Sequence, residues 1–325
     1  MKKLLVGILS LAMIMSLAAC GTNNKDTAAP ELKYPEKEIT IAVPAKAGGG
    51  GDVFARNTAE AAQKDGTTFV VENYAGGGGA SAMSYAWGRP HDGYTMMVVT
   101  TSTIVANPYS YELPNAVSDW RGVIRVMADA TVLFVRADSG IKTVEEFVEL
   151  AKTKKLTIGG YSVGSVDHIG AFTFGKEAGF EFEYVPYDSG ADSIVAVLGG
   201  HIDAAFTQYS DLVSNSEAGT VTVLANAANE RYAGLEDIPT FQEKGWNVPE
   251  LSNWRGYVVA KDTPDEIVAK LHDIVAKAIK EESFVNYMNT SKLSPAEVAA
   301  DDFTKLIQDQ YAAMGESLKT LGLLN

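Results

Sequence analysis

The chain has 325 residues, and 41 Asp and Glu residues against 27 Lys and Arg residues give it a formal net charge of −14 at pH 7. This acidic balance argues against nucleic-acid binding and against peripheral binding to anionic lipid. The length is large for one hydrophobic core and suits two domains. The only cysteine is Cys20, so neither a disulfide framework nor thiol chemistry is expected.

The first 33 residues are typical of an export and attachment segment. Met1-Lys2-Lys3 precedes an apolar stretch at 4–17 and the sequence Leu17-Ala-Ala-Cys20, which is the order of a secretory signal. The apolar stretch is shorter than the roughly 20 residues that span a bilayer. Leu-Ala-Ala-Cys resembles a bacterial lipobox. We therefore expect a signal peptide at 1–19, lipidation of Cys20 and a tether at 20–33; a soluble secreted protein with one stray cysteine is the alternative.

The start of the predicted folded body combines a strand, a glycine turn and a helix. Ile39 to Val43 is β-branched and apolar, and Pro44 ends the strand. Gly48 to Gly51 lack Cβ atoms, so their N–H groups can approach a bound group closely. Asp52 is expected to cap a helix that runs to about Lys64. Such a site suits an anion, although a plain strand-to-helix connection would also explain the pattern.

The next segments repeat this arrangement. Strands are expected at 67–72 and 95–100, with a second glycine turn at 76–79 and a helix at 80–87 between them. The β-α-β-α-β order predicts a doubly wound parallel sheet. Ligands of such sheets bind beyond the carboxyl ends of the strands, where both glycine turns are expected. Ser102, just past the third strand, is a weaker candidate on the same argument.

A second β-α-β-α-β unit follows. Two strand-like pieces at 123–127 and 131–135 are expected to cross to it, and Thr143 opens a helix to Lys152 with a capping box. Further strands are expected at 156–160, 182–186, 204–206 and 220–225, and further helices at 169–178 and 191–198. The chain then returns through a strand at 254–260 to three helices, starting at Thr263-Pro264, at Ser294-Pro295 and at Phe303.

The second unit offers its own candidate site loop, Tyr161 to His168, with Ser162, Gly164 and Ser165 before a helix. Two opposed helix N-termini with hydroxyl groups between them suit a small anion with a negative group at each end. Tyr187, Ser189 and Asp203 are expected at strand ends and are further candidates. Each of these three residues also fits an ordinary turn or cap.

A different function is suggested by Gly160-Tyr-Ser162-Val-Gly164, which matches the nucleophile elbow of hydrolases. Asp203 or Asp211, followed by His272, would complete the triad order. His272, however, falls within a regular amphipathic helix and not in a loop. The four histidines are scattered and no Gly-Lys-Ser/Thr follows a glycine run, so we expect no metal, no phosphate-transfer site and no cofactor.

A series of short motifs, each occurring once, follows a fixed order along the chain. In the first half they are Tyr34-Pro35, Val43-Pro44, Gly48 to Gly50 with Asp52, Ala55-Arg56, Val71-Glu-Asn73, Gly78-Gly79, Asp92-Gly93-Tyr-Thr95 and Asn107-Pro108. In the second half they are Gly164-Ser165 with His168, Val185-Pro-Tyr187 with Gly190, Leu198-Gly-Gly with Asp203, Arg231 and Ile238-Pro-Thr240. This pattern resembles the substrate-binding proteins of the tripartite tricarboxylate transporter family, the extracytoplasmic solute receptors of the TctC and Bug type. The match covers essentially the whole body after the tether.

The resemblance implies an α/β fold of the periplasmic-binding-protein type (type II, Venus-flytrap), with a ligand cleft between two hinged domains. We expect domain 1 at 34–130 plus 228–325 and domain 2 at 131–227. It also implies a monomer without a cofactor that is lipid-anchored outside the cytoplasmic membrane, binds a small carboxylate and delivers it to a permease of one large and one small subunit. The ligand-binding residues expected by position are Ala45, Lys46, Ala47, Gly49, Asp52, Ser102, Ser162, Ser165, Tyr187 and Asp203.

The chain departs from the family pattern at several positions. Ala45 and Lys46 stand where an aromatic and then a small residue are usual; Gly51 replaces a usual Thr, Asp188 replaces a usual Lys, and Arg255 follows Trp254 where an aromatic is common. One hypothesis is that Ala45 enlarges the pocket while Lys46 adds a cation at its edge, which favours a larger or more highly charged acid; alternatively Lys46 points to solvent. Citrate-like tricarboxylates, C4 dicarboxylates, aromatic acids and acidic amino acids remain candidates. A lipoprotein that senses a ligand for a membrane receptor, and a serine hydrolase using Ser162, remain alternative functions.

Overall fold

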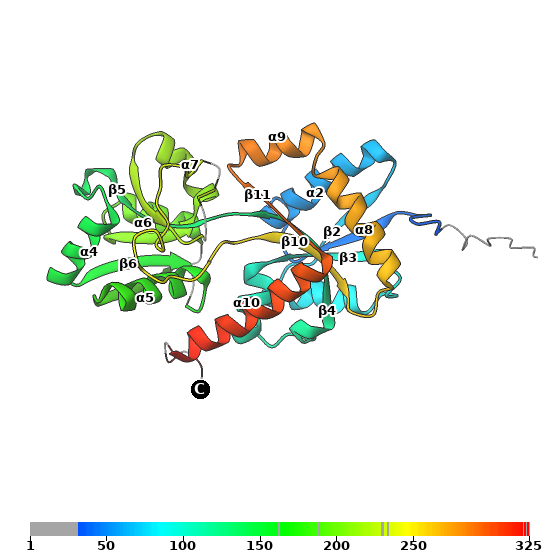
Figure 1. Cartoon of the computed structure of the whole chain (residues 1–325), viewed down its shortest axis with the longest axis horizontal. Helices are drawn as coiled ribbons and strands as arrows, with labels where there is room; N and C mark the ends of the chain where they lie inside the picture. Colours follow the sequence, from blue (N-terminus) through cyan, green and yellow to red (C-terminus); the bar gives the residue numbers. More distant parts are fainter. Residues whose placement is uncertain are drawn as a thin grey trace, which may run out of the picture. The chain divides into compact units, whose positions relative to one another are not determined.

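The computed structural model describes residues 32–161, 163–187, 189–228, 231–232, 234–320, 322 and 324. The predicted signal peptide, Cys20, Ser162 and Asp188 therefore lie outside the described residues. Residues 35–325 form one compact unit that contains two β-sheets with helices packed on them (Figure 1).

The first sheet has six strands in the order β11-β4-β10-β3-β1-β2. The strands are β1 (Ile39–Val43), β2 (Phe69–Asn73), β3 (Thr95–Thr100), β4 (Trp120–Ala128), β10 (Arg255–Ala260) and β11 (Ser294–Ala299). Strand β1 pairs parallel with β2 and β3, whereas β10 is antiparallel to β3 and β4, and β11 is antiparallel to β4. The first sheet is therefore mixed and not wholly parallel as predicted.

The second sheet has five strands in the order β7-β6-β8-β5-β9. The strands are β5 (Thr131–Arg136), β6 (Leu156–Tyr161), β7 (Phe182–Tyr187), β8 (Ala204–Gln208) and β9 (Val221–Asn226). Strand β6 is parallel to β7 and β8, and β5 is antiparallel to β8 and β9. This sheet too is mixed, because β5 enters it from the first sheet in the opposite direction.

Nine α-helices cover the two sheets within the described part of the chain. They are α2 (Gly50–Ala62), α3 (Ala80–Trp87), α4 (Val144–Thr153), α5 (Val166–Ala178), α6 (Gly190–Leu198), α7 (Tyr209–Glu217), α8 (Asp265–Ala278), α9 (Glu282–Thr290) and α10 (Ala300–Thr320). The segment after β3 forms two short helical turns, η3 (Thr101–Ala106) and η4 (Asn107–Tyr109). Helices α7 and α9 were not predicted, since each is short and follows directly on another element.

The chain passes between the sheets twice, from β4 to β5 and from β9 to β10. The two crossings are hydrogen-bonded to each other: Asp129 N–H donates to the Asn253 carbonyl (3.2 Å), and Asn253 N–H donates to the Asp129 carbonyl (2.8 Å). Buried threonines satisfy neighbouring carbonyls, with Thr101 donating to Ser252 and Thr131 donating to Leu251. The two crossings therefore form one braced link between the sheets.

Several local predictions are confirmed. Strand β3 and helix α3 have the predicted bounds, and Thr143 caps α4 in a capping box, with its hydroxyl accepting from Glu146 N–H (3.2 Å). These elements follow from side-chain patterns within a few residues, which is why the sequence identifies them.

Three predicted helix starts are wrong. Helix α2 begins at Gly50 with Gly49 as its cap, and Asp52 stands in the first turn; glycines can enter a helix, so the helix starts earlier than its first strong capping residue. Helix α8 is capped by Pro264 and not by Thr263. Residues 294–299 form strand β11, because pairing with β4 overrides the helix-like Ser-Pro pattern, and an edge strand with a bulge tolerates Pro295.

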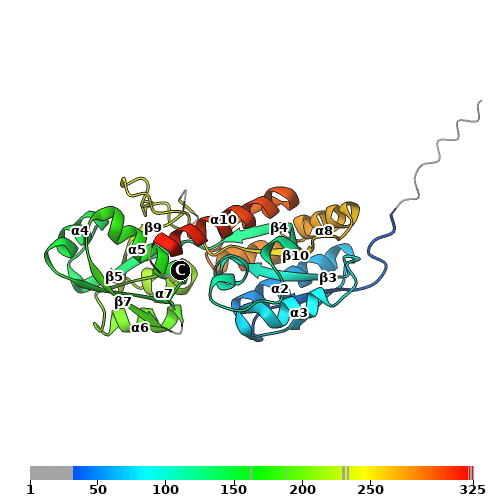
Figure 2. The same ribbon diagram turned by 90° about the horizontal axis from the view of Figure 1, so that it is seen from below.

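Helix α10 packs closely on the first sheet and extends toward the helices of the second (Figure 2). Its Phe303 ring lies over Gly122 of β4 and Gly256 of β10, where a side chain would meet the ring at 2.8 Å. The opposite face of β10 is covered by α2, whose Phe54 stacks on Tyr257 with ring centroids 5.1 Å apart. Glycine is therefore required where helix and sheet come closest.

We expect Gly256→Ala to lower the free energy of unfolding by about 1–3 kcal/mol, because its Cβ would collide with Phe303 and with the Ile124 carbonyl. Urea unfolding followed by circular dichroism measures this loss. Gly51→Ala is the matched control, since its Cβ would meet only ordinary contacts at 3.5–3.8 Å and alanine favours a helix. Equal stability of Gly256→Ala and the wild type would contradict this account of the packing.

Candidate ligand-binding site

The buried side chain of Asp52 stabilises the loop after β1. The carboxylate of Asp52 is 3% exposed and accepts hydrogen bonds from Gly48 N–H (2.8 Å), from Asn73 Nδ2 (3.0 Å) and from Arg56 Nε (3.1 Å). Asn73 also donates to the Ala45 carbonyl (3.0 Å). Asp52 therefore holds the loop in shape, and its oxygens are occupied by protein donors.

The charge of Asp52 is stabilised by these contacts. Burial alone raises the pKa of this carboxyl, but the hydrogen bonds from Arg56, Gly48 and Asn73 outweigh burial and hold the pKa below its ordinary value. Of the other predicted residues in this loop, Ala45 and Gly49 are half-buried, and Lys46 and Ala47 are exposed. Backbone groups and one lysine thus form the accessible part of the loop.

The loops after β2 and β3 lie beside each other. Asn107 Nδ2 donates to the Gly78 carbonyl (2.8 Å), and the Tyr111 ring covers Gly78 so closely that a Cβ there would stand 2.6 Å from Tyr111 Cδ2. Gly78 also has a φ of +63°, a conformation that glycine adopts readily. The second glycine turn therefore seats the segment that contains Ser102 and Tyr111.

The predicted site loop between β6 and α5 is held together by hydrogen bonds among its own residues. The Ser165 hydroxyl caps α5 by accepting from His168 N–H (3.2 Å) and donates to the Tyr161 carbonyl (2.6 Å). Gly164 N–H donates to His168 Nδ1 (3.0 Å), and burial lowers the pKa of His168 to about 4, so the ring is neutral. The Ser165 side chain is thus a cap as well as a lining residue.

One cavity of about 300 Å³ brings residues of both sheets together. Its lining comes from the η3–η4 segment and from the loop between β6 and α5: Ser102, Ala106, Asn107, Ser110, Tyr111, Tyr161, Val163, Gly164 and Ser165. Ser102, Gly164 and Ser165 were predicted, and Tyr161 and Val163 lie within the predicted site loop. Asn107, Ser110 and Tyr111 were missed as site residues, although Asn107-Pro108 was one of the motifs that carried the family resemblance.

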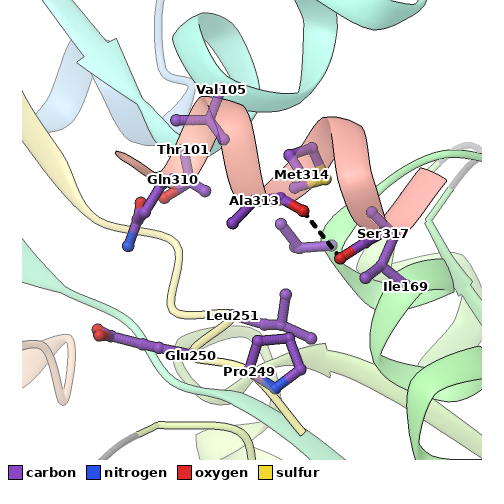
Figure 3. A pocket seen from close by; sticks show the side chains of 11 residues that line it. Thr101, Val105, Ile169, Pro249, Glu250, Leu251, Gln310, Ala313, Met314 and Ser317 are labelled. Carbon is purple, nitrogen blue, oxygen red and sulfur yellow. Dashed lines mark hydrogen bonds between the residues drawn. The ribbon is translucent and has the colours of Figure 1, made fainter. Parts of the chain in front are cut away.

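A second, smaller cavity of about 50 Å³ lies between α10, α5, the η3 segment and the return crossing (Figure 3). Val105, Ile169, Leu251 and Met314 give it a mainly apolar lining, and the Ser317 hydroxyl donates to the Ala313 carbonyl (2.9 Å). Its volume holds little more than a water or two. It does not fit a dicarboxylate, so the cavity lined by Ser102 and Ser165 is the better candidate of these two.

Tyr187 and Asp203 were both expected to line the cleft. Tyr187 does lie at the carboxyl end of β7, half-buried, with its ring against Gly159. Asp203 is a correction, because it precedes β8 and lies level with Thr157 at the amino end of β6. Its oxygens are bound by Lys154 (3.0 Å) and by Thr157 N–H (2.8 Å) and Oγ1 (2.9 Å). It braces the opposite end of the sheet.

The partners of the alternative hydrolase triad are not brought together among the described residues. His272 lies in α8, which packs on β4 and α2 of the first sheet, whereas Asp211 lies in α7 beside the second. Within the described ranges no group of three or more His, Cys, Asp or Glu side chains could hold a metal ion. In the same part of the chain no helix is long and apolar enough to cross a membrane.

Comparisons with known proteins agree with this architecture. The family model described as the tripartite tricarboxylate transporter family receptor matches residues 53–323. A UPF0065 protein of Bordetella pertussis is 25% identical over 317 residues, which is 96% of each chain. A TctC solute binding protein from Polaromonas is 28% identical with a TM-score of 0.80, over 89% of this chain and 100% of that one.

A protein of R. palustris solved with adipate is 25% identical with a TM-score of 0.75, over 89% of this chain and 99% of that one. The fold class predicted from the sequence is confirmed by these structures, which are solute-binding proteins of the two-domain periplasmic type. The chain belongs to the tripartite tricarboxylate transporter family of receptors, as its sequence motifs indicated.

Proposed function

We propose that this protein is an extracytoplasmic lipoprotein that captures a small carboxylate and delivers it to a tripartite tricarboxylate-type permease with one large and one small subunit. The observation that carries the proposal is the cavity of about 300 Å³ whose lining comes from both sheets and is rich in hydroxyl and amide groups. Family membership and the relative that was solved with adipate support a carboxylate as the ligand.

The binding elements in this proposal are backbone N–H groups and neutral donors. The exposed loop at Lys46 and Ala47, with Gly49 and the first turn of α2, would face one end of the ligand. Ser102 and the start of α5 at Ser165 would face the other. In this proposal Lys46 places a positive charge at the edge of the ligand site, Ser162 donates a hydrogen bond and the Tyr187 ring lines the site. Asp52 contributes indirectly, because it holds the loop after β1 in shape. Asp203 is left out.

Ligand capture also requires the two halves to move. We infer that residues 34–130 with 228–325 act as one domain and 131–227 as the other, and that they close about the braced crossings at Asp129 and Asn253. A ligand that contacts both halves binds the closed state better and shifts the equilibrium toward it. The protein would work as a monomer without a cofactor, and it would be a receptor and not an enzyme.

The same capture could serve a membrane receptor that senses the ligand. A receptor of this kind would copurify with the loaded protein in place of permease subunits. The family description favours transport.

We expect a thermal-shift screen of the chain from Thr22 onward to show a clear rise in melting temperature with one class of carboxylate. A ligand at about 100 times its dissociation constant stabilises the folded state by roughly 2.7 kcal/mol. The panel holds citrate, succinate, malate, adipate, terephthalate, aspartate and glutamate, with the matched diamides as controls. The screen is repeated after unfolding and refolding to remove copurified ligand. A refolded protein that responds to no acid would contradict the proposed function.

We expect Asp52→Asn to weaken binding of the acid found in that screen by roughly tenfold, because the ion pair with Arg56 (2.9 Å) is lost and the loop loosens. Isothermal titration calorimetry measures the affinity. Asp65→Asn is the matched control, since Asp65 pairs with Lys277 (2.6 Å) at the far end of the same helical segment. Unchanged affinity in Asp52→Asn would show that the loop needs no brace.

The same variant should reveal a pH dependence. The pKa of Asp52 is lower in the folded protein than in the unfolded chain, so its contribution to stability is complete above the unfolded value of about 3.9. That contribution is lost as the pH falls through the lower folded value. The difference in unfolding free energy between wild type and Asp52→Asn should therefore shrink below about pH 4.

We expect Cys20→Ser to move the protein from the membrane fraction to the soluble extracytoplasmic fraction, because the proposed lipid on Cys20 is the anchor. Detergent phase partitioning of labelled protein measures the distribution. Ligand affinity should stay the same in both forms. Membrane retention of Cys20→Ser would argue for another mode of attachment.

A further inference from the structure

Two oppositely charged side chains stand near the crossings without an ion-pair partner among the described residues. Arg255 is the first residue of β10 and is half-buried, and Asp211 lies exposed in the first turn of α7.

Arg255 points at the start of α2. A Cβ on Gly50 would stand 2.8 Å from Arg255 Nη2. Arg255 Nη1 donates to the thioether of Met127 (3.6 Å), which is a weak acceptor, and the guanidinium also interacts with the Tyr287 hydroxyl and with the charge of Asp129. Tyr287 of α9 lies close to the guanidinium. A cation placed against the positive end of a helix is unfavourable unless an anion joins them. The arrangement therefore favours a bound carboxylate.

The carboxylate of Asp211, in α7, lies beside the first residue of another helix, α6. Its Oδ2 is 2.9 Å from the point where a Cβ of Gly190 would stand, and Thr207 Oγ1 is 2.5 Å from that same point. The Thr207 hydroxyl is buried without a hydrogen-bond partner. No described side chain forms an ion pair with Asp211, so its carboxylate can accept from an ammonium group.

A short chain of contacts holds the two charges near each other. Arg255 is two residues from Asn253, which exchanges backbone hydrogen bonds with Asp129. The Asp129 carboxylate binds Ser210 through its N–H (3.1 Å) and its hydroxyl (2.5 Å), and Ser210 precedes Asp211. Asp129 is thereby occupied. Arg255 and Asp211 interact electrostatically, but they do not form an ion pair.

We propose that the ligand carries an ammonium group as well as a carboxylate, with Arg255 and the first turn of α2 binding the carboxylate and Asp211 binding the ammonium. The substrate class is then the amino acids. This inference rests on the proposed function, which brings a carboxylate between the two sheets. If Arg255 and Asp211 instead paired directly with each other in the closed protein, an ammonium group on the ligand would bring no gain. Only the proposed arrangement therefore predicts that an amino acid binds more tightly than the same acid without its amino group.

The test compares acids that differ only in the amino group: L-aspartate with succinate, L-glutamate with glutarate, and L-phenylalanine with 3-phenylpropanoate. Calorimetry on the refolded chain should show that at least one amino acid binds about tenfold or more tightly than its deaminated partner. Asp211→Asn, an exposed and nearly isosteric change, should remove that preference. Arg255→Gln should weaken both members of the pair, and Arg255→Lys should restore part of the affinity.

Arg136→Gln with Asp138→Asn is the matched control, because this ion pair lies at the opposite end of the second sheet. The control should keep both the affinity and the preference. Equal binding of each acid and its amino partner by the wild type, or a preference that survives Asp211→Asn, would overturn the inference and leave the proposed function standing. If the refolded protein binds none of these six acids and no acid of the carboxylate panel, the proposed function itself is overturned.

Discussion

The backbone pairing between Asp129 and Asn253 is the constraint on which the rest of the structure depends. Because the two crossings are hydrogen-bonded to each other, β4 and β10 must be neighbours in the first sheet, and β5 must accept β9 in the second. The carboxyl ends of β3 and β6 then open toward the same space, as the lining of the cavity at Ser102 and Ser165 shows. Buried hydroxyls of Thr101 and Thr131 fix the link from both sides. Because the two crossings are joined in this way, residues of both sheets can line one site.

An acidic protein can bind an acid because the local arrangement of charges differs from the net charge. Asp52 is directed inward and neutralised by Arg56, which leaves backbone N–H groups and Lys46 exposed in that loop. Burial raises the pKa of Asp129, in the crossing, to about 6 and that of Asp167, in α5, to about 7. These carboxyls carry less negative charge near neutral pH than ordinary aspartates do.

Much of the fold could be predicted from the sequence because its signals are local. The bounds of β3 and α3 and the cap at Thr143 depend on residues a few positions apart. The strand β11 could not be predicted, since its Ser-Pro start is the same pattern that begins a helix and only pairing with β4 distinguishes the two. Mixed sheets were missed for the same reason: the direction of β5 and β10 is set by the crossings.

The candidate site was predictable only in part. The loops were found, because glycine turns and helix starts are visible in sequence, but the roles of single residues depend on direction and contact. Asp203 could have been excluded earlier, since it precedes its strand and the amino ends of parallel strands lie away from a ligand edge. Arg255 and Asp211 are 44 residues apart, and only the hydrogen bonds of the crossing bring them near each other.

The same contacts bear on the choice between a receptor and a hydrolase. In the loop between β6 and α5, the carbonyl of Tyr161 accepts from both Ser165 and Tyr184, and the N–H of Tyr161 donates to Asp167. The histidine of this segment, His168, uses Nδ1 to accept from Gly164 and is too weak a base to take a proton at neutral pH. A general base needs a free nitrogen directed at its nucleophile, whereas a binding loop needs donors held in fixed positions. These hydrogen bonds hold the loop in a fixed shape, which suits it to bind and release a ligand without altering it chemically.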